Sequence, residues 1–189
     1  MAGGVDLRVE SGVVPVVGGT GKAGRRVVGP LLAGATVAMG LMAGLFLAFD
    51  VSVMPGLAAG DDRTYVTAMQ HINKSIENGL FGLVFVGAFV ATGLAAWLLH
   101  RAGRRRPALW AALATALYAV ALIVTAGVNI PLNNELAAAG DPARIHDLAA
   151  VRAGFAEGWV PANMFRTALC TGGLLALIRT LVLHGRAGR

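Results

Sequence analysis

The sequence predicts an all-α integral membrane protein, a bundle of four transmembrane helices with amphipathic helices in its outer loops. Four long apolar stretches support this fold class, at Val27–Phe49, Gly79–Leu99, Ala108–Val128 and Trp159–Leu183. Because a helix rises about 1.5 Å per residue, each stretch can cross a hydrocarbon core of roughly 30 Å. The composition agrees, since 56% of the residues are hydrophobic and 14% are charged, and an ordinary soluble domain carries more charge.

Before the first span, residues 1–26 are expected to form a disordered cytoplasmic tail. Within it, Gly19–Gly24 matches the dinucleotide-binding pattern G-x-G-x-x-G. A nucleotide-binding fold also needs a helix, a second strand and an acidic residue about 20 positions later. Here the chain enters the apolar run Leu31–Phe49 directly, and Asp50 is the first acidic residue after the pattern. We therefore expect no nucleotide site in the tail.

Charge is distributed unevenly among the segments that join the spans. The formal net charge is +6, and basic residues gather before the first span, at Arg101–Arg106 and near the C-terminal end, where residues 184–189 form a basic tail. The positive-inside rule then predicts a multi-pass plasma membrane protein with both termini in the cytoplasm. The Arg101–Arg106 cluster is typical of a topology anchor that contacts anionic lipid, so we expect no nucleic-acid partner.

The two outer loops resemble each other. Each has a proline where a span ends, Pro55 or Pro131, and then a Gly-Asp turn that finishes at Asp61 or Asp141. Because aspartate is a favoured N-cap, each loop is expected to hold a helix that leads towards the next span. The parallel suggests two helical hairpins related by duplication; a chance match between short Ala- and Gly-rich segments is the alternative.

Helical periodicity extends the second span outwards. Tyr65, Met69 and Ile76 recur at the spacing of one helix face, so we expect this helix to begin near Asp62–Thr64. Residues 144–155 predict a shorter amphipathic helix of the same kind before the fourth span.

The fourth span is interrupted by Arg166. An ionisable group near mid-membrane costs at least ~2.5–3.5 kcal/mol. Steps of three and four residues place Asn163, Arg166 and Cys170 on one stripe of a helix. Trp159 precedes this stripe, and Pro161 would suit the first turn of the helix. The stripe is either an inward-facing polar patch or a snorkelling arginine beside an interfacial tryptophan. We favour the inward patch, because the outer side has few basic residues and Asn163 shares the stripe.

Two further polar clusters lie at the same outer end. Asn129, Asn133 and Asn134 follow the third span, and His71 with Asn73 lies on the extension of the second. Alternatively, the asparagines cap an ordinary helix exit and the histidine face is simply solvated. The convergence of three polar clusters over an apolar interior is typical of a binding site.

The sequence predicts no metal site and no cofactor. His71 and His146 are isolated from any metal-ligand pattern. The single cysteine, Cys170, excludes an internal disulfide.

Two motifs resemble the anthrone oxygenase-like membrane family, long classed as a domain of unknown function. They are Asn129-Ile-Pro-Leu-Asn-Asn-Glu-Leu136 and Trp159-x-x-x-Asn163-x-x-Arg166-Thr167, accompanied by Met69-Gln-x-Ile-Asn73. The resemblance covers residues 27–183 and implies a small four-helix membrane domain. Some members are similar to enzymes that oxidise polyketide anthrones to anthraquinones with O₂ and no cofactor, whereas many have no assigned activity.

The resemblance implies an oxygenase for an apolar aromatic substrate. Removing a ring proton from an anthrone gives an enolate that reacts with O₂, so the site needs an apolar slot, a base and donors for the oxyanion. We expect Arg166, Asn163 and Asn129 to supply donors. His71 is the expected base, with Asp50 second and also placed to pair with Arg166. Further substrate contacts are expected from Asn73, Asn133, Asn134 and Trp159.

Two other functional classes stay open. One is a small transporter or channel subunit, in which Arg166 binds an anion and the proline-interrupted span lines a path. The other is a structural partner protein without catalysis, for which glycine-rich helix faces suffice. The lipid bilayer and an apolar small molecule are the expected partners, and the sequence leaves the oligomeric state open.

Overall fold

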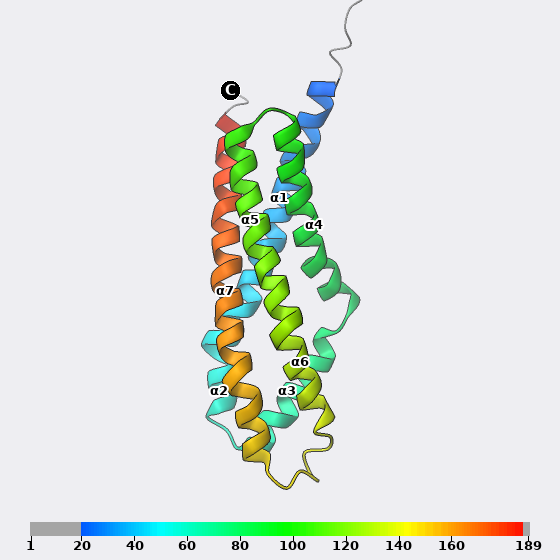
Figure 1. Cartoon of the computed structure of the whole chain (residues 1–189), viewed down its shortest axis with the longest axis vertical. Helices are drawn as coiled ribbons and strands as arrows, with labels where there is room; N and C mark the ends of the chain where they lie inside the picture. The colour runs from blue at the N-terminus through cyan, green and yellow to red at the C-terminus, as the bar shows by residue number, and fades with distance from the viewer. Residues whose placement is uncertain (1–19, 187–189) are drawn as a thin grey trace, which may run out of the picture.

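The computed structural model describes residues 20–186 and confirms the predicted fold class. Four of its helical segments are long and apolar enough to cross a membrane: Val27–Ala58, Gly79–Arg101, Arg105–Ala138 and Leu148–Arg186. They run alternately up and down in one elongated bundle (Figure 1), and the described residues contain no β-strand. The chain therefore has the build of a multi-pass membrane protein.

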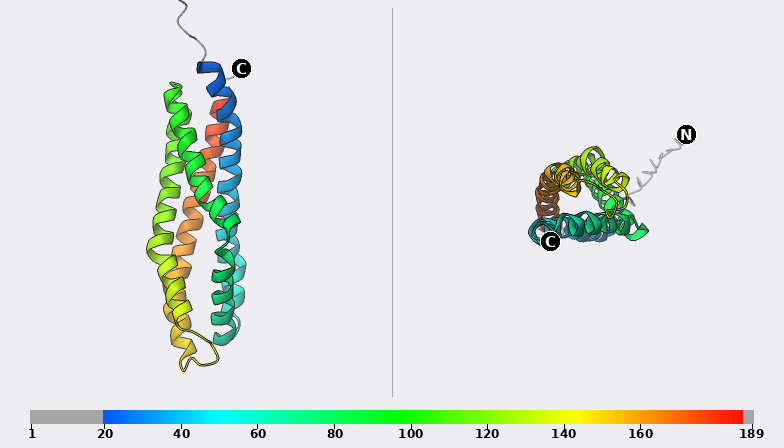
Figure 2. Two further views of the ribbon diagram at one scale, coloured as in Figure 1. Left: turned by 90° about the vertical axis from the view of Figure 1, so that its right-hand side faces the viewer. Right: turned by 90° about the horizontal axis from the view of Figure 1, so that it is seen from below.

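Each long helix packs against two of the others. The helices are α1 (Thr20–Ala48), α4 (Gly79–Arg101), α5 (Arg105–Val124) and α7 (Leu148–Arg186). α1 contacts α4 and α7, and α5 contacts the same two helices, so the four surround one core (Figure 2).

Apolar side chains fill this core and also cover the outside of the bundle. Leu32, Met39 and Tyr118 have no exposed surface, whereas Leu41 and Leu175 are more than half exposed. Helices that are apolar on every face are expected where the outer faces contact lipid. The outward leucines therefore agree with a membrane location for the bundle.

The two ends of the bundle differ in character. The start of α1, the end of α7 and the turn between α4 and α5 lie together at one end (Figure 1). There the Arg104 guanidinium donates to the carbonyls of Leu183 and His184, at 3.3 and 3.0 Å. The short helices α2 (Met54–Ala58), α3 (Asp62–Ile76) and α6 (Ile130–Ala138) lie at the opposite end, which we call the outer end. The orientation of these ends in a membrane stays a prediction.

Two helical turns near the outer end are widened. η1 (Phe49–Val53) joins α1 to α2, and η2 (Thr125–Asn129) joins α5 to α6, both with π-type geometry. A proline follows each at the same spacing, Pro55 or Pro131. Because proline has no N–H and crowds the carbonyl four residues earlier, the preceding turn cannot keep regular α-helical bonding, and a π turn absorbs the defect. Contrary to expectation, the helical segments do not end at these prolines, and the matched turns add to the parallel between the two hairpins.

A helix begins at Asp62, as expected, but it does not continue into the second span. α3 ends at Ile76 and a separate α4 begins at Gly79. Between them the Asn78 side chain accepts the Phe81 N–H at 3.0 Å, which caps the new helix and lets the chain turn. The break matters for function, because it places residues 77 and 78 beside the interior of the bundle.

The fourth span belongs to a single long helix. α7 begins at Leu148, where the Asp147 carboxylate accepts the Ala150 N–H at 2.9 Å, and it runs to Arg186 with Pro161 inside it. The expected separate helix over residues 144–155 is therefore wrong, and Pro161 does not lie in a first turn. The continuous helix carries the polar stripe from the outer end into the bundle.

One of the two predicted aspartate caps is confirmed. Asp61 accepts the Thr64 N–H at 2.8 Å at the start of α3, and this bond holds the pKa of the Asp61 carboxyl below its usual value. Asp141 accepts the Ala143 N–H at 2.9 Å, but this bond closes a turn rather than starting a helix. The cap of α7 is Asp147 instead.

Arg152 ties the outer loop between α2 and α3 to α7. Its guanidinium pairs with Asp62 at 2.8 Å and donates to the carbonyls of Ala58 and Gly60 at 2.9 and 3.2 Å. The same group lies 4.8 Å from the centre of the Tyr65 ring. These contacts fix the start of α3 against α7, at the opposite end of α3 from the α3–α4 break.

The expected N-terminal tail lies mostly outside the described residues. Residues 1–19 and 187–189 fall there, including the first glycine of the Gly19–Gly24 pattern. Thr20–Gly24 belong to α1, so the helix begins ahead of the expected start at Val27, and α7 likewise runs past Leu183.

Candidate functional site

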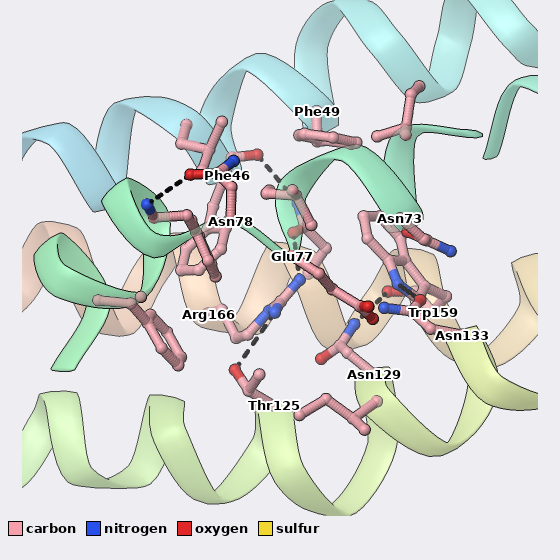
Figure 3. A pocket seen from close by; sticks show the side chains of 18 residues that line it. Phe46, Phe49, Asn73, Glu77, Asn78, Thr125, Asn129, Asn133, Trp159 and Arg166 are labelled. Atoms are coloured by element: carbon pink, nitrogen blue, oxygen red, sulfur yellow. Dashed lines mark hydrogen bonds between the residues drawn. The ribbon is translucent and has the colours of Figure 1, made fainter. Parts of the chain in front are cut away.

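A cavity of about 320 Å³ lies in the outer half of the bundle, and we call it the inner cavity (Figure 3). Its volume is at the lower end of the roughly 300–1,000 Å³ typical of small-molecule sites. The wall is mostly apolar and aromatic, and its polar members come from α3, the α3–α4 break, η2, α6 and α7. The apolar lining consists of Leu45, Phe46, Phe49, Ile72, Ile76, Phe81, Gly82, Phe85, Ile130 and Trp159.

Arg166 points into this cavity from α7 (Figure 3) and is 5% exposed. Its guanidinium donates to the Thr125 hydroxyl at 3.2 Å and to the side-chain oxygen (Oδ1) of Asn163 at 2.7 Å. The guanidinium carbon lies 4.3 Å from the centre of the Phe46 ring and 5.6 Å from that of Trp159. Arg166 is thus inward-facing, as favoured from the sequence, and it does not snorkel.

The contacts of Arg166 offset much of the cost of burying it. A charge inside a membrane costs at least ~2.5–3.5 kcal/mol. Hydrogen bonds that involve a charged group contribute about 1.5–3 kcal/mol each, and each desolvated cation–π contact contributes up to about 2 kcal/mol. The two hydrogen bonds and the two cation–π contacts together are large enough to keep the guanidinium inside the bundle.

Asn163 connects Arg166 to the first span. Its amide nitrogen donates to the Phe46 carbonyl at 2.9 Å and to the Asp50 carboxylate, and Asp50 also accepts from the Thr167 hydroxyl. Asp50 was expected to pair with Arg166 directly. Among the described residues the structure has no such ion pair, because Asn163 stands between the two groups and bonds to both.

Trp159 and two asparagines form the outer wall of the cavity. The Trp159 indole N–H donates to the Asn133 side chain at 2.8 Å, and the Asn129 amide donates to the Trp159 carbonyl at 3.4 Å. The Trp159 ring also packs against Phe49 and Phe155, with centroids 5.5 and 5.7 Å apart. The indole is therefore held by neighbours on both sides and shapes the cavity rather than anchoring the helix at the membrane surface.

Three polar groups in the cavity wall have no hydrogen-bond partner. They are the Arg166 Nε, the Asn73 Nδ2 and the Asn129 Oδ1, each on a residue that lines the cavity. Two are donors and one is an acceptor. Because a buried polar group without a partner costs about 1–3 kcal/mol, their gathering at one cavity indicates a ligand that supplies the missing partners.

The family model for anthrone oxygenase matches residues 75–176, just over half of the chain. The chain belongs to the anthrone oxygenase family. Comparisons with curated proteins and with solved structures found no match. The region matched to the anthrone oxygenase family holds Arg166, Asn163 and Asn129, whereas Phe46, Asp50 and Asn73 precede it.

The inner cavity brings together six of the nine predicted site residues of this anthrone oxygenase family member. They are Arg166, Asn163, Asn129, Asn133, Asn73 and Trp159. Three others lie elsewhere: Asp50 is behind Asn163, while His71 and Asn134 line a separate hollow on the outside. The functional roles of all nine stay predictions.

Three residues of the site were missed as site members from the sequence. Thr125 and Phe46 contact Arg166, and Glu77 lines the cavity next to Asn73. Glu77 follows the polar segment that holds His71 and Asn73, and the continuous helix expected there would have kept it on a solvated face. A hydroxyl in the middle of an apolar span could have pointed to Thr125.

Within residues 20–186, no three His, Cys, Asp or Glu side chains are placed to hold a metal ion. The chemistry that this site can support rests on a cation, amides, a hydroxyl and one carboxylate around an apolar slot.

Proposed function

We propose that the protein is a membrane oxygenase that oxidises a planar, apolar aromatic substrate of the anthrone type with O₂ in the inner cavity. The observation that carries this proposal is the buried guanidinium of Arg166, which Thr125 and Asn163 hold in the wall of an aromatic cavity while its Nε–H has no protein partner. Membership of the anthrone oxygenase family supports the type of reaction.

The reaction needs a carbon acid, a base and an oxidant. Loss of one proton from the ring CH₂ of an anthrone moves an electron pair onto the carbonyl oxygen and gives an enolate. The ring carbon then bonds to O₂, which is reduced to a hydroperoxide. Loss of the second hydrogen from that carbon and cleavage of the O–O bond leave a quinone carbonyl. In total one O₂ is consumed, one C=O is formed and one water is released.

Arg166 is suited to stabilise the enolate oxygen. Its Nε–H has no protein partner, whereas each Nη group donates one hydrogen bond, to Thr125 or to Asn163. A charge-assisted hydrogen bond is about twice as strong as a neutral one, and an apolar setting strengthens it further. A bond from Arg166 to the carbonyl oxygen would therefore strengthen as negative charge develops there, and it would lower the energy of the transition state more than that of the neutral substrate.

Asn163 is better suited to position Arg166 than to donate to the substrate. Its amide nitrogen already donates twice, to Phe46 and Asp50, and its carbonyl oxygen accepts from Arg166. The role expected from the sequence, a second oxyanion donor, would require breaking one of these bonds. Asn129 and Asn73 keep unpartnered polar atoms and are the better candidates for contacts with oxygen substituents on the rings.

The test is the conversion of anthrone to anthraquinone by the purified protein in lipid nanodiscs. O₂ uptake and quinone absorbance are recorded together, and empty nanodiscs correct for spontaneous oxidation. We expect one O₂ consumed per quinone formed, and large losses of rate in Arg166→Ala and Asn163→Ala. A rate no higher than that of empty nanodiscs would refute the proposal. Unchanged rates in both variants would remove these residues from the mechanism.

A further inference from the structure

A second hollow adjoins the inner cavity at the outer end. It has a volume of about 620 Å³ and is lined by polar residues of α3 and α6, among them His71, Lys74 and Asn134. We call it the outer pocket. Asn73, Glu77 and Asn133 line both the inner cavity and the outer pocket. These three residues therefore form the partition between an apolar interior and a polar, outward-facing space.

Glu77 occupies this partition because of the break between α3 and α4. α3 ends at Ile76, and Glu77 follows as its C-terminal cap. Figure 3 shows the Glu77 side chain extending into the cavity towards Asn129 and Asn133. The residue is exposed, and neither ion pair of the described residues, Arg144–Asp141 or Arg152–Asp62, involves its carboxylate.

The other acid–base candidates are less well placed. His71 lines the outer pocket and not the inner cavity. The Asp50 carboxylate is occupied by Asn163 and Thr167 and does not line the cavity. Among the described residues, Glu77 is the carboxylate that lines the cavity, and no histidine does so.

We propose that Glu77 is the base that removes the ring proton of the substrate, with its carboxylate facing the outer pocket as well as the inner cavity. This inference rests on the proposed function and replaces His71 in the role of base. The distinguishing feature is that one carboxylate without an ion-pair partner and the Arg166 cation line the same, mostly apolar cavity.

The steps balance as follows. A Glu77 carboxylate oxygen takes the first CH₂ proton while the C–H electron pair moves to the carbonyl oxygen beside Arg166. After the carbon has bonded to O₂, the glutamic acid returns this proton to the terminal peroxide oxygen. The carboxylate then takes the second hydrogen from the same carbon as a proton, the C–H pair forms the new C=O, and the O–O bond breaks. The hydroxide that leaves takes the proton from Glu77 and departs as water.

The outer pocket gives this water a polar way out. A water molecule released into an apolar cavity has few partners, whereas the outer pocket offers the side chains of Gln70, His71 and Lys74. A base at the partition can thus reach the substrate on one side and solvent on the other.

The decisive experiment isolates proton removal from oxygen chemistry. Anthrone is incubated without O₂ in D₂O buffer with the full-length protein in nanodiscs, and deuterium entry at the ring CH₂ is followed by NMR above the rate with empty nanodiscs. Wild type, Glu77→Gln, Glu77→Asp and His71→Gln are compared. Glu157→Gln is the matched control, because Glu157 is an exposed carboxylate on α7 that lines neither hollow.

We expect Glu77→Gln to slow exchange by about 100-fold or more, the usual loss when a general base is removed. Glu77→Asp should recover part of the rate, while Glu157→Gln exchanges like wild type. A loss of exchange in His71→Gln that exceeds the loss in Glu77→Gln would overturn the proposal and return the role of base to His71. Anthraquinone binding, measured by quenching of tryptophan fluorescence, should be retained in Glu77→Gln, which a merely structural role would not predict.

Two other outcomes separate the two proposals. If wild type consumes O₂ with anthrone but Glu77→Gln exchanges at the wild-type rate, Glu77 is not the base and the proposed function stands. If wild type neither exchanges deuterium nor consumes O₂ above empty nanodiscs, the proposed function fails and the role of Glu77 fails with it.

Discussion

Replacing Arg166 with methionine separates the catalytic role of the guanidinium from its structural role. Methionine keeps the length and apolar bulk of the side chain but removes the charge and every N–H. The substitution therefore deletes the proposed oxyanion donor and leaves the cavity close to its present shape.

The stability terms of this substitution have opposite signs. The variant loses the bonds to Thr125 and Asn163, about 1.5–3 kcal/mol each, and the contacts with Phe46 and Trp159, about 0.5–2 kcal/mol each. The variant no longer carries the cost of the buried charge, which is at least ~2.5–3.5 kcal/mol, and it gains the packing of an apolar side chain. Replacing buried charged groups with well-packed apolar ones is often neutral, so we expect a folded variant. Catalysis has no such compensation, and loss of one oxyanion donor lowers the rate by about 10²–10³.

The assay is O₂ uptake with anthrone in nanodiscs, normalised to folded protein, beside thermal unfolding of each variant in detergent. Arg152→Met is the matched control, because Arg152 also lies on α7 and makes charged contacts, with Asp62 and the Ala58 and Gly60 carbonyls, but does not line the cavity. We expect Arg152→Met to lower stability and keep the rate per folded molecule. Wild-type activity in Arg166→Met would refute the reasoning, because it would show that the guanidinium contributes nothing to the reaction.

Three further predictions test other parts of the structure. Asp50→Asn should lower kcat about tenfold, with less effect on KM. Asn163 and Thr167 each lose a charged acceptor worth about 1.5–3 kcal/mol, so Arg166 is held less firmly. Wild-type kcat and KM in steady-state assays of this variant would contradict the prediction. Thermal unfolding should show Gly158→Ala to be less stable than Gly154→Ala by about 1 kcal/mol. A Cβ added at Gly158 meets Leu132 at 2.9 Å, whereas one added at Gly154 meets nothing within 4 Å. Equal stabilities of the two variants would show that Leu132 moves aside without cost. The folded-state pKa of Asp61 lies below its usual value of 3.8, so its carboxylate contributes stability above that pH and loses the contribution as the pH falls through the folded-state pKa. The stability difference between wild type and Asp61→Ala should therefore shrink below pH 3.8, and a difference that stays constant with pH would argue against the cap.

The fold was predictable because length and hydropathy leave few choices for a chain of this kind. A membrane requires backbone polar groups to be satisfied within each segment, so four apolar runs predict four helices. The boundaries were not predictable to the same degree. Asn78 caps α4 by a side-chain bond that periodicity does not register. The π turn η2 precedes Pro131, and the helical segment continues past this proline into α6.

The polar stripe of α7 was predictable because helical spacing alone places Asn163 and Arg166 on one face. The partners of that stripe were harder to infer, because they come from segments far away in sequence. Thr125 reaches Arg166 across 41 positions, and Asp50 reaches Asn163 across 113. Glu77 was missed as a cavity residue for a local reason, since its position depends on the break after Ile76.

The most direct test is an experimental structure of the protein in nanodiscs with anthraquinone bound. We expect the rings in the inner cavity among Phe46, Phe49 and Trp159, with one quinone oxygen about 2.7–2.9 Å from a nitrogen of Arg166. A cavity filled by a lipid chain, or a quinone bound elsewhere while Arg166 keeps all its present neighbours, would contradict the proposal that oxidation takes place beside this guanidinium.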